Sequence, residues 1–398
     1  MEQAADGGEC TVSTDNVTTT DSSHTLGGKP PRTRIVCADA LNIVACFAVV
    51  VLHCSLTVFG PARDTSWSVA LVWQSASIFA VPVFFMISGM NLIGYRDRQT
   101  TEHFFKRRLL KVGGALLFGS IVCYVLYCAF PSSFFGGEKF AGTFGLIDFV
   151  KRFLTNDIND TYWFLYAIIY LYLLTPILSL IAKNKRCIQY ILALCLCVSV
   201  LIPLVEKMGF NPMYFGTLFN WPLFSSVSLL YYLGGYYLHT YTQPLTRNGR
   251  VVALVFVIVS VAGMALSGFQ LNAGASAKPG MSYDPFFTDT ASPFCVMLAF
   301  SLFLLFQSSE NWLKRRKPIS LKRIRTVSGL SLDIYLFHVM VINWLGTFVP
   351  PNVKDVFLMF PIAEAALVYA LTALLAFAGK WTFAHAKDAI TKTVHQNG

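Results

Sequence analysis

The sequence predicts an all-α, polytopic membrane protein of about ten transmembrane helices with both termini in the cytoplasm. Its 398 residues are 55% hydrophobic and 13% charged, with a mean hydropathy of +0.56, whereas soluble domains are about 25% charged. Apolar stretches long enough to cross a bilayer as helices recur along the chain. They occupy residues 35–59, 69–94, 109–130, 162–182, 188–206, 222–241, 251–270, 291–309, 328–349 and 357–379.

The distribution of basic residues predicts the orientation of these spans. Of the 31 Lys and Arg residues, 24 lie in the tails and loops on the side of the N-terminus, and seven lie in the loops on the other side. Such a bias marks the cytoplasmic face. The net charge of +10 therefore reflects topology and contact with anionic lipids, and no nucleic-acid partner is expected. We expect a multi-pass protein of the plasma membrane.

The chain is expected to divide into three parts. Residues 1–33 are rich in Ser, Thr, Asp and Gly and predict a disordered cytoplasmic tail without the apolar core of a cleavable signal peptide. Residues 34–380 form the transmembrane domain, and residues 381–398 form a cytoplasmic C-terminal tail. The longest outer loop, 131–161, is either a functional lid or acceptor contact or an amphipathic cap that rests on the bilayer.

The first span carries three polar residues, Asp39, Asn42 and His53. At 3.6 residues per turn, the 11 positions from Asn42 to His53 make about three turns, and Asp39 lies about one turn before Asn42, so all three share one helix face. Ionisable residues within a span are costly and usually mark function. The alternative is a hydrogen bond that only joins two helices. An imidazole titrates near neutral pH, which makes His53 a candidate acid or base.

Other spans add further candidates. Arg107, Arg108 and Lys111 stand at the cytoplasmic start of the third span, where they either anchor the helix or bind the phosphates of a nucleotide or coenzyme A. In the ninth span, Tyr335 and His338 are neighbours on one face. The remaining features are a Pro82 to Gly89 segment that allows a kink and close helix packing, Trp163 at an interface, and ten cysteines without zinc-ligand spacing, so no metal is expected.

Several of these stretches, in this order, resemble the acyltransferase-3 family of bacterial integral membrane O-acyltransferases, over roughly residues 34–380. The matching stretches are Asp39 to His53, Phe84 to Gly89, Phe105 to Lys111, Tyr162 to Leu165, Tyr172 to Pro176, Leu233 to Tyr236 and Ser331 to His338. One departure concerns the family's opening motif, which pairs an arginine with the histidine. Asn42 stands at the arginine position, and an amide lacks the fixed charge and planar fork of a guanidinium.

The resemblance implies transfer of an acyl group, usually acetyl, from cytoplasmic acetyl-CoA to a hydroxyl of a cell-surface glycan or lipid-linked sugar. It implies that His53 is the general base or the acyl relay. The donor phosphates would lie near Arg107, Arg108 and Lys111, and the substrates would pass Asp39, Asn42, Trp163, Tyr335 and His338. The superfamily also contains glycan exporters and sensor-like membrane domains, so a flippase and a membrane sensor are the alternative functions.

Overall fold

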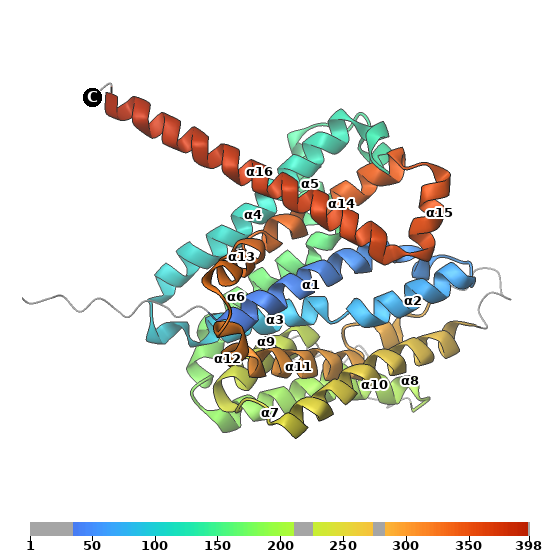
Figure 1. Cartoon of the computed structure of the whole chain (residues 1–398), viewed down its shortest axis with the longest axis vertical. Coiled ribbons are helices and arrows are strands. Elements are labelled where there is room, and N and C mark those ends of the chain that lie inside the picture. The colour runs from blue at the N-terminus through green and yellow to red at the C-terminus, as the bar shows by residue number, and fades with distance from the viewer. Residues whose placement is uncertain (1–34, 211–225, 274–282, 397–398) are drawn as a thin grey trace, which may run out of the picture. The chain divides into compact units, whose positions relative to one another are not determined.

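The computed structural model describes residues 35–210, 226–273 and 283–396, and every regular element in this part of the chain is a helix (Figure 1). The tail predicted for residues 1–33 lies outside the described residues. Nine segments of the described chain are long and apolar enough to span a membrane, which confirms an all-α, polytopic membrane protein. The remaining expected span, 222–241, begins outside the described residues and ends in a buried helix of 15 residues.

Among the described residues, the spanning part of the bundle consists of eleven helices, of which one, α7, is continued by α8. They are α1 (Val36–Cys54), α2 (Thr65–Ser77), α3 (Ala80–Leu92), α4 (Thr101–Ala129), α6 (Trp163–Ile181), α7 (Lys185–Leu196) continued by α8 (Ile202–Lys207), α9 (Val227–Tyr241), α10 (Arg247–Asn272), α11 (Pro293–Ser308), α14 (Ser331–Phe348) and α16 (Pro361–Gln396). The shorter helices are α5 (Leu146–Leu154), α12 (Glu310–Lys314), α13 (Pro318–Ser328) and α15 (Pro351–Met359).

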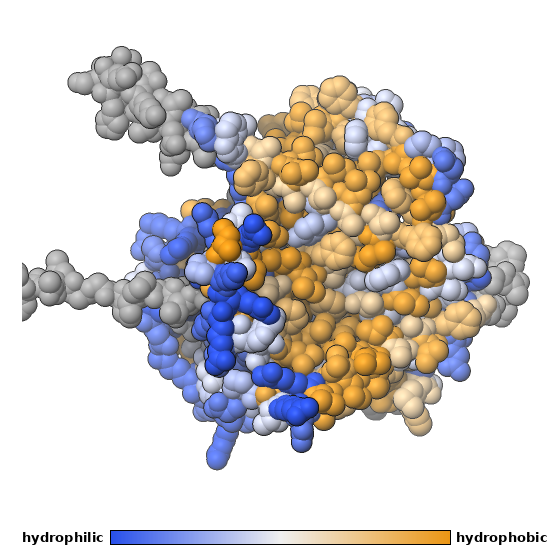
Figure 2. All heavy atoms as spheres, viewed as in Figure 1, coloured by the Kyte–Doolittle hydropathy of each residue, from blue (hydrophilic) through white to orange (hydrophobic). Residues whose placement is uncertain are grey.

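Helix α1 lies at the centre of the bundle, where it packs against α2, α3, α11, α13, α14 and α16. Its polar residues therefore face protein rather than lipid. Figure 2 shows apolar side chains over the sides of the helices and hydrophilic residues concentrated at the end that carries α12 and α13. The sequence predicts a C-terminal tail from residue 381, but helix α16 runs without a break through this position to Gln396. The cytoplasmic location of residues 381–398 stays a prediction.

The second span is interrupted, as the proline in its sequence predicts. Helix α2 ends at Ser77 and α3 begins at Ala80. Pro82 has no backbone N–H, so the carbonyl of Ile78, four residues earlier, receives no helical hydrogen bond. The regular helix is therefore interrupted just before the proline, and α3 packs against α9.

A carboxylate from another helix caps the first turn of α1. Glu310, the first residue of α12, accepts hydrogen bonds from the backbone N–H of Val36 at 3.1 Å and of Cys37 at 2.6 Å. It also forms an ion pair with Lys314 at 3.1 Å. Burial by itself raises the pKa of Glu310, but the hydrogen bonds from Cys37 and Lys314 outweigh it, and the pKa lies below its usual value. The first N–H groups of a helix have no partner within the helix, so this contact fixes the start of the central span.

Replacing Glu310 with Ala is expected to lower the free energy of unfolding by about 1–2 kcal/mol, because two N–H groups of α1 lose their acceptor. The pKa of Glu310 is lowered in the folded state, so its contribution is present above the unfolded-state pKa of about 4.3 and is lost as the pH falls through the folded-state pKa. Thermal unfolding in detergent micelles at pH 7 measures the effect. A Glu310→Gln variant, which keeps one acceptor oxygen, should unfold between the wild type and the alanine variant. Equal unfolding of Glu310→Ala and the wild type would contradict the capping role.

Candidate active site

Two histidines from helices far apart in the sequence are in contact within the bundle. His53 belongs to the last turn of α1, and His338 lies near the middle of α14. Their ring centroids are 5.2 Å apart, and the ring planes meet at 55°. His338 is fully buried, whereas His53 is partly exposed. His53 is therefore the more exposed member of the pair.

The hydrogen bonds of His338 determine where its proton lies. Nδ1 lies 2.8 Å from the carbonyl oxygen of Tyr335 and 3.1 Å from that of Ile334. Because both partners only accept, Nδ1 carries the proton, and Nε2 of the neutral ring is an acceptor. Nε2 is buried and has no hydrogen-bond partner among the described residues. The pair therefore contains a free proton-accepting nitrogen in an apolar environment, beside a second imidazole.

Aromatic side chains from three spans surround the buried histidine. The ring centroid of Tyr335 lies 5.8 Å from that of His338 and 5.4 Å from that of Phe164, and Phe84 contacts both Tyr335 and Phe164. The Tyr335 hydroxyl donates a hydrogen bond to the carbonyl oxygen of Thr161, just before α6. These contacts fix the histidine pair against α3 and α6, and they exclude water from one side of it.

Asp39 and Asn42 connect α1 to the junction between α13 and α14. The amide nitrogen of Asn42 lies 2.9 Å from the hydroxyl of Ser331 and 3.1 Å from that of Ser328. The Ser328 hydroxyl donates to a carboxylate oxygen of Asp39 at 2.9 Å. Together with the contact between His53 and His338, these bonds show that the polar face of α1 lies against α13 and α14. The described contacts of Asn42 join helices, which is one of the two roles expected for this face.

Charged residues from α4, α14 and α16 gather at the same junction. Lys380 forms an ion pair with Asp333 at 2.5 Å and donates a hydrogen bond to the carbonyl oxygen of Gly329 at 2.8 Å. Lys111 interacts electrostatically with both Lys380 and Asp333, and also with Arg107 and Arg108. Arg107 is exposed and Arg108 is half-buried. Four cations, Arg107, Arg108, Lys111 and Lys380, therefore form a cationic surface at the end of α1 opposite His53.

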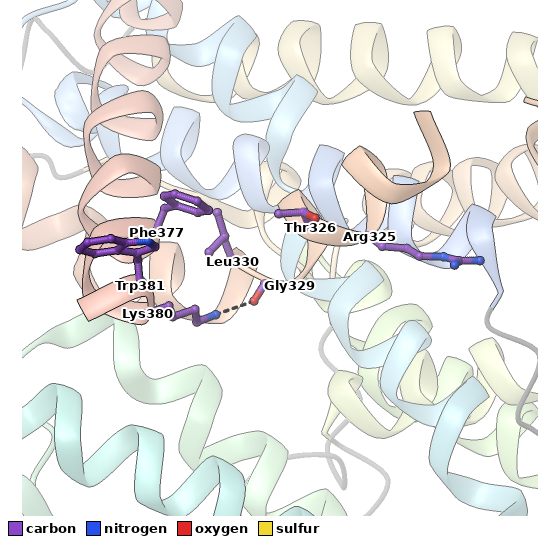
Figure 3. Close-up of a pocket in the computed structure, with 7 residues that line it drawn as sticks. All are labelled: Arg325, Thr326, Gly329, Leu330, Phe377, Lys380 and Trp381. Atoms are coloured by element: carbon purple, nitrogen blue, oxygen red, sulfur yellow. Dashed lines mark hydrogen bonds between the residues drawn. The ribbon is translucent and has the colours of Figure 1, made fainter. Parts of the chain in front are cut away.

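A cavity of about 400 Å³ lies beside this cationic surface. Figure 3 shows its lining: the rings of Phe377 and Trp381 lie near Leu330, Lys380 reaches the carbonyl of Gly329, and the guanidinium of Arg325 extends away from the others. Thr326 completes the lining. The cavity therefore has aromatic and aliphatic walls and one cation at its edge, Lys380, which is already paired with Asp333.

The structure separates the predicted site residues into two groups. His53, His338 and Tyr335 come together in one group, and Asp39 and Asn42 contact the α13–α14 junction. Lys111 interacts electrostatically with Asp333 and Lys380 at this junction and with Arg107 and Arg108 of its own helix, and Arg108 also interacts with Tyr172 and Tyr232. Trp163 is 47% exposed, and it is the adjacent Phe164 that contacts Tyr335.

The sequence interpretation did not include Ser328, Ser331 and Lys380 in the site. Their partners lie far away along the chain, so no local spacing marks them. Within the described ranges, the histidine pair has no third metal ligand nearby, and no group of three His, Cys, Asp or Glu side chains could hold a metal ion.

The fold and this arrangement define a class: a polytopic membrane protein with a paired histidine site inside the bundle and a cationic surface at one end. Comparison with protein families identifies the class further. The family model described as "Acyltransferase domain" matches residues 35–384, nearly the whole chain, so the protein belongs to this acyltransferase family and is a membrane acyltransferase. No curated protein and no solved structure matches the chain.

Proposed function

We propose that this acyltransferase moves an acetyl group from cytoplasmic acetyl-CoA to a hydroxyl group of a cell-surface glycan or a lipid-linked sugar. The observation that carries the proposal is the arrangement of α1. One end of its polar face meets the cationic surface, and the other end holds His53 against His338. A helical rise of about 16 Å separates Asn42 from His53. Acetyl-CoA is a polyanion with a long linear arm, so its phosphates and its thioester suit the two ends.

The proposed chemistry needs one proton acceptor at the histidine pair. The acceptor hydroxyl oxygen attacks the thioester carbonyl carbon, and His53 takes the hydroxyl proton as general base. The bond between carbon and sulfur breaks, and the CoA thiolate leaves and is protonated from the pair or from solvent. The free Nε2 of His338 can share the added proton with His53. Tyr335 and Phe164 would keep water from competing with the acceptor.

The direct test is transfer of radiolabelled acetyl from acetyl-CoA in membrane vesicles of cells that produce the protein. We expect label in the glycan fraction that depends on the protein and is released by mild alkali, as oxygen esters are. Absence of protein-dependent label, combined with protein-dependent movement of glycan across the vesicle membrane, would favour the exporter instead. Binding of acetyl-CoA to the purified protein provides an independent check, because an exporter has no need of it.

Replacing Arg107 with Gln is expected to raise the KM for acetyl-CoA about tenfold with little change in kcat, because a charge-assisted hydrogen bond to a phosphate contributes about 1.5 kcal/mol in both the ground and transition states. Arg107 is exposed, so the fold should tolerate the change. The matched control is Arg323→Gln, an exposed residue of the basic segment that includes α13. Initial-rate kinetics over a range of acetyl-CoA concentrations measure both. If Arg323→Gln raised the KM for acetyl-CoA as much as Arg107→Gln, the effect would come from general surface charge and not from a contact with Arg107.

A further inference from the structure

Helix α5, in the loop between α4 and α6, is strongly amphipathic and leaves its apolar face uncovered. Leu146, Ile147 and Leu154 are 77%, 88% and 73% exposed, and Val150 on the same face is 44% exposed. Such exposure is unusual for four large apolar residues in nine, and in a soluble environment it would mark an interaction site.

Two hydrogen bonds fix the level of α5 relative to the spans. Tyr124, five residues before the end of α4, donates to a carboxylate oxygen of Asp148 at 2.9 Å. Tyr166, three residues into α6, donates to the carbonyl oxygen of Phe153. With a rise of 1.5 Å per residue, these anchor points lie about 5–8 Å inside the ends of the two spans. Helix α5 therefore lies level with the last turns of α4 and the first turn of α6, and not beyond their ends.

Ion pairs fix the rotation of α5 about its own axis. Arg152 pairs with Asp148 at 2.8 Å and with Asp157 at 2.7 Å. Phe149 packs against Tyr124 and Phe153 against Tyr166 on the same side of the helix. These contacts and the ion pairs hold that side against the protein, and the four exposed apolar residues point away from it. Lys151 is exposed at the edge of the apolar face, where its long stem can carry the ammonium to lipid phosphates.

Helix α4, which contacts α5 through Tyr124 and Asp148, has an apolar outer surface. Helix α4 is a membrane span, and it exposes large apolar side chains along its length and in the loop that follows it. They are Leu117, Phe118, Ile121, Val125, Phe130 and Phe135. The uncovered face of α5 continues this apolar surface at the end of the span.

We propose that α5 is an interfacial helix whose apolar face inserts into the leaflet opposite the basic clusters, which is the outer leaflet in the predicted topology. Its partner is the lipid surface itself: acyl chains around Ile147 and Leu154, and headgroup phosphates around Lys151. The loop that follows α5 ends at Thr161, which accepts the hydrogen bond from Tyr335. The membrane thereby holds one wall of the histidine site in place. This proposal does not depend on the identity of the acyl donor or acceptor.

The test places a fluorescent amino acid by stop-codon suppression at position 147, and in separate proteins at positions 154 and 138. Glu138 is an exposed acidic residue of the same loop and provides the matched control. Each full-length protein is reconstituted in lipid nanodiscs. Brominated acyl chains quench a fluorophore within the bilayer, and aqueous iodide quenches one in water.

We expect brominated lipid to reduce the fluorescence at positions 147 and 154 more than at 138, and iodide to show the reverse order. Iodide quenching at 147 and 154 as strong as at 138 would place the helix in water and overturn the proposal. Protection from both quenchers would mean that protein, such as a second copy of the chain, covers the face, and it would overturn the proposal as well.

Discussion

Replacing His53 with Ala is expected to lower kcat for acyl transfer by about 10²- to 10⁴-fold, the range that general acid–base catalysis supplies. The physical reason is that His53 is the more exposed member of the histidine pair and the proposed general base, so its removal takes away the group that accepts the proton of the acceptor hydroxyl. His53 is partly exposed and lies in the last turn of α1, so its removal should not open a large cavity in the core. The measurement is the rate of acetyl transfer at saturating acetyl-CoA, normalised to folded protein.

Two further variants separate catalysis from structure. His53→Gln keeps a hydrogen-bonding group but cannot take up a proton, so it should be nearly as inactive as the alanine variant. His239→Ala removes an exposed histidine from the last turn of α9 and should keep the wild-type rate. If well-folded His53→Ala transferred acetyl at the wild-type rate, the catalytic role of His53 would have to be abandoned.

The contact of His53 with His338 also makes a prediction about combined variants. Residues that act as one catalytic unit show strongly non-additive effects. We expect His338→Gln to lower kcat, and the double variant with His53→Ala to be no slower than His53→Ala alone. Additive losses would instead indicate that His338 acts separately, by holding Tyr335 and the surrounding aromatic residues.

The fold and part of the site could be predicted from sequence because they depend on local regularities. Hydropathy over about 20 residues marks a span, and a helical period of 3.6 residues placed Asp39, Asn42 and His53 on one face. Those regularities do not specify the opposite partner of each residue. That Ser331 bonds Asn42, and that Glu310 caps α1, follows from packing between segments more than 270 residues apart in the sequence.

Asn42 illustrates how the structure changes the interpretation of a motif. The family motif has an arginine at this position, and the amide is the main departure of the chain from the pattern. In the structure, the half-buried amide donates to the hydroxyls of Ser328 and Ser331, and a polar group with such partners is stabilising. The position therefore keeps a defined contact with the α13–α14 junction, and the exposed or half-buried cations of α4 remain as candidates for donor binding.

The second large effect concerns folding: Gly89→Ala is expected to prevent close packing of α3 and α9 and to abolish most of the folded protein. A Cβ atom at Gly89 would overlap the backbone carbonyl of Tyr232, and one at Gly235 would overlap the backbone carbonyl of Met86. Backbone atoms cannot rotate away as a side chain can, so the two helices would have to separate. Overpacking costs about 1–3 kcal/mol where side chains can adjust, and here the cost should reach or exceed that range. Small residues allow this kind of approach between membrane helices.

Gly113→Ala, in α4, is the matched control, because a Cβ atom there would meet nothing within 4 Å. Alanine is the better helix former by about 1 kcal/mol, so this variant should be at least as stable as the wild type. The measurement is the yield of monodisperse protein in mild detergent together with its thermal unfolding temperature. A Gly89→Ala protein as abundant and as stable as Gly113→Ala would show that α3 and α9 can separate without cost. Loss of folded protein in both variants would show that the membrane helices tolerate no added methyl group, and that the contact with Tyr232 has no special role.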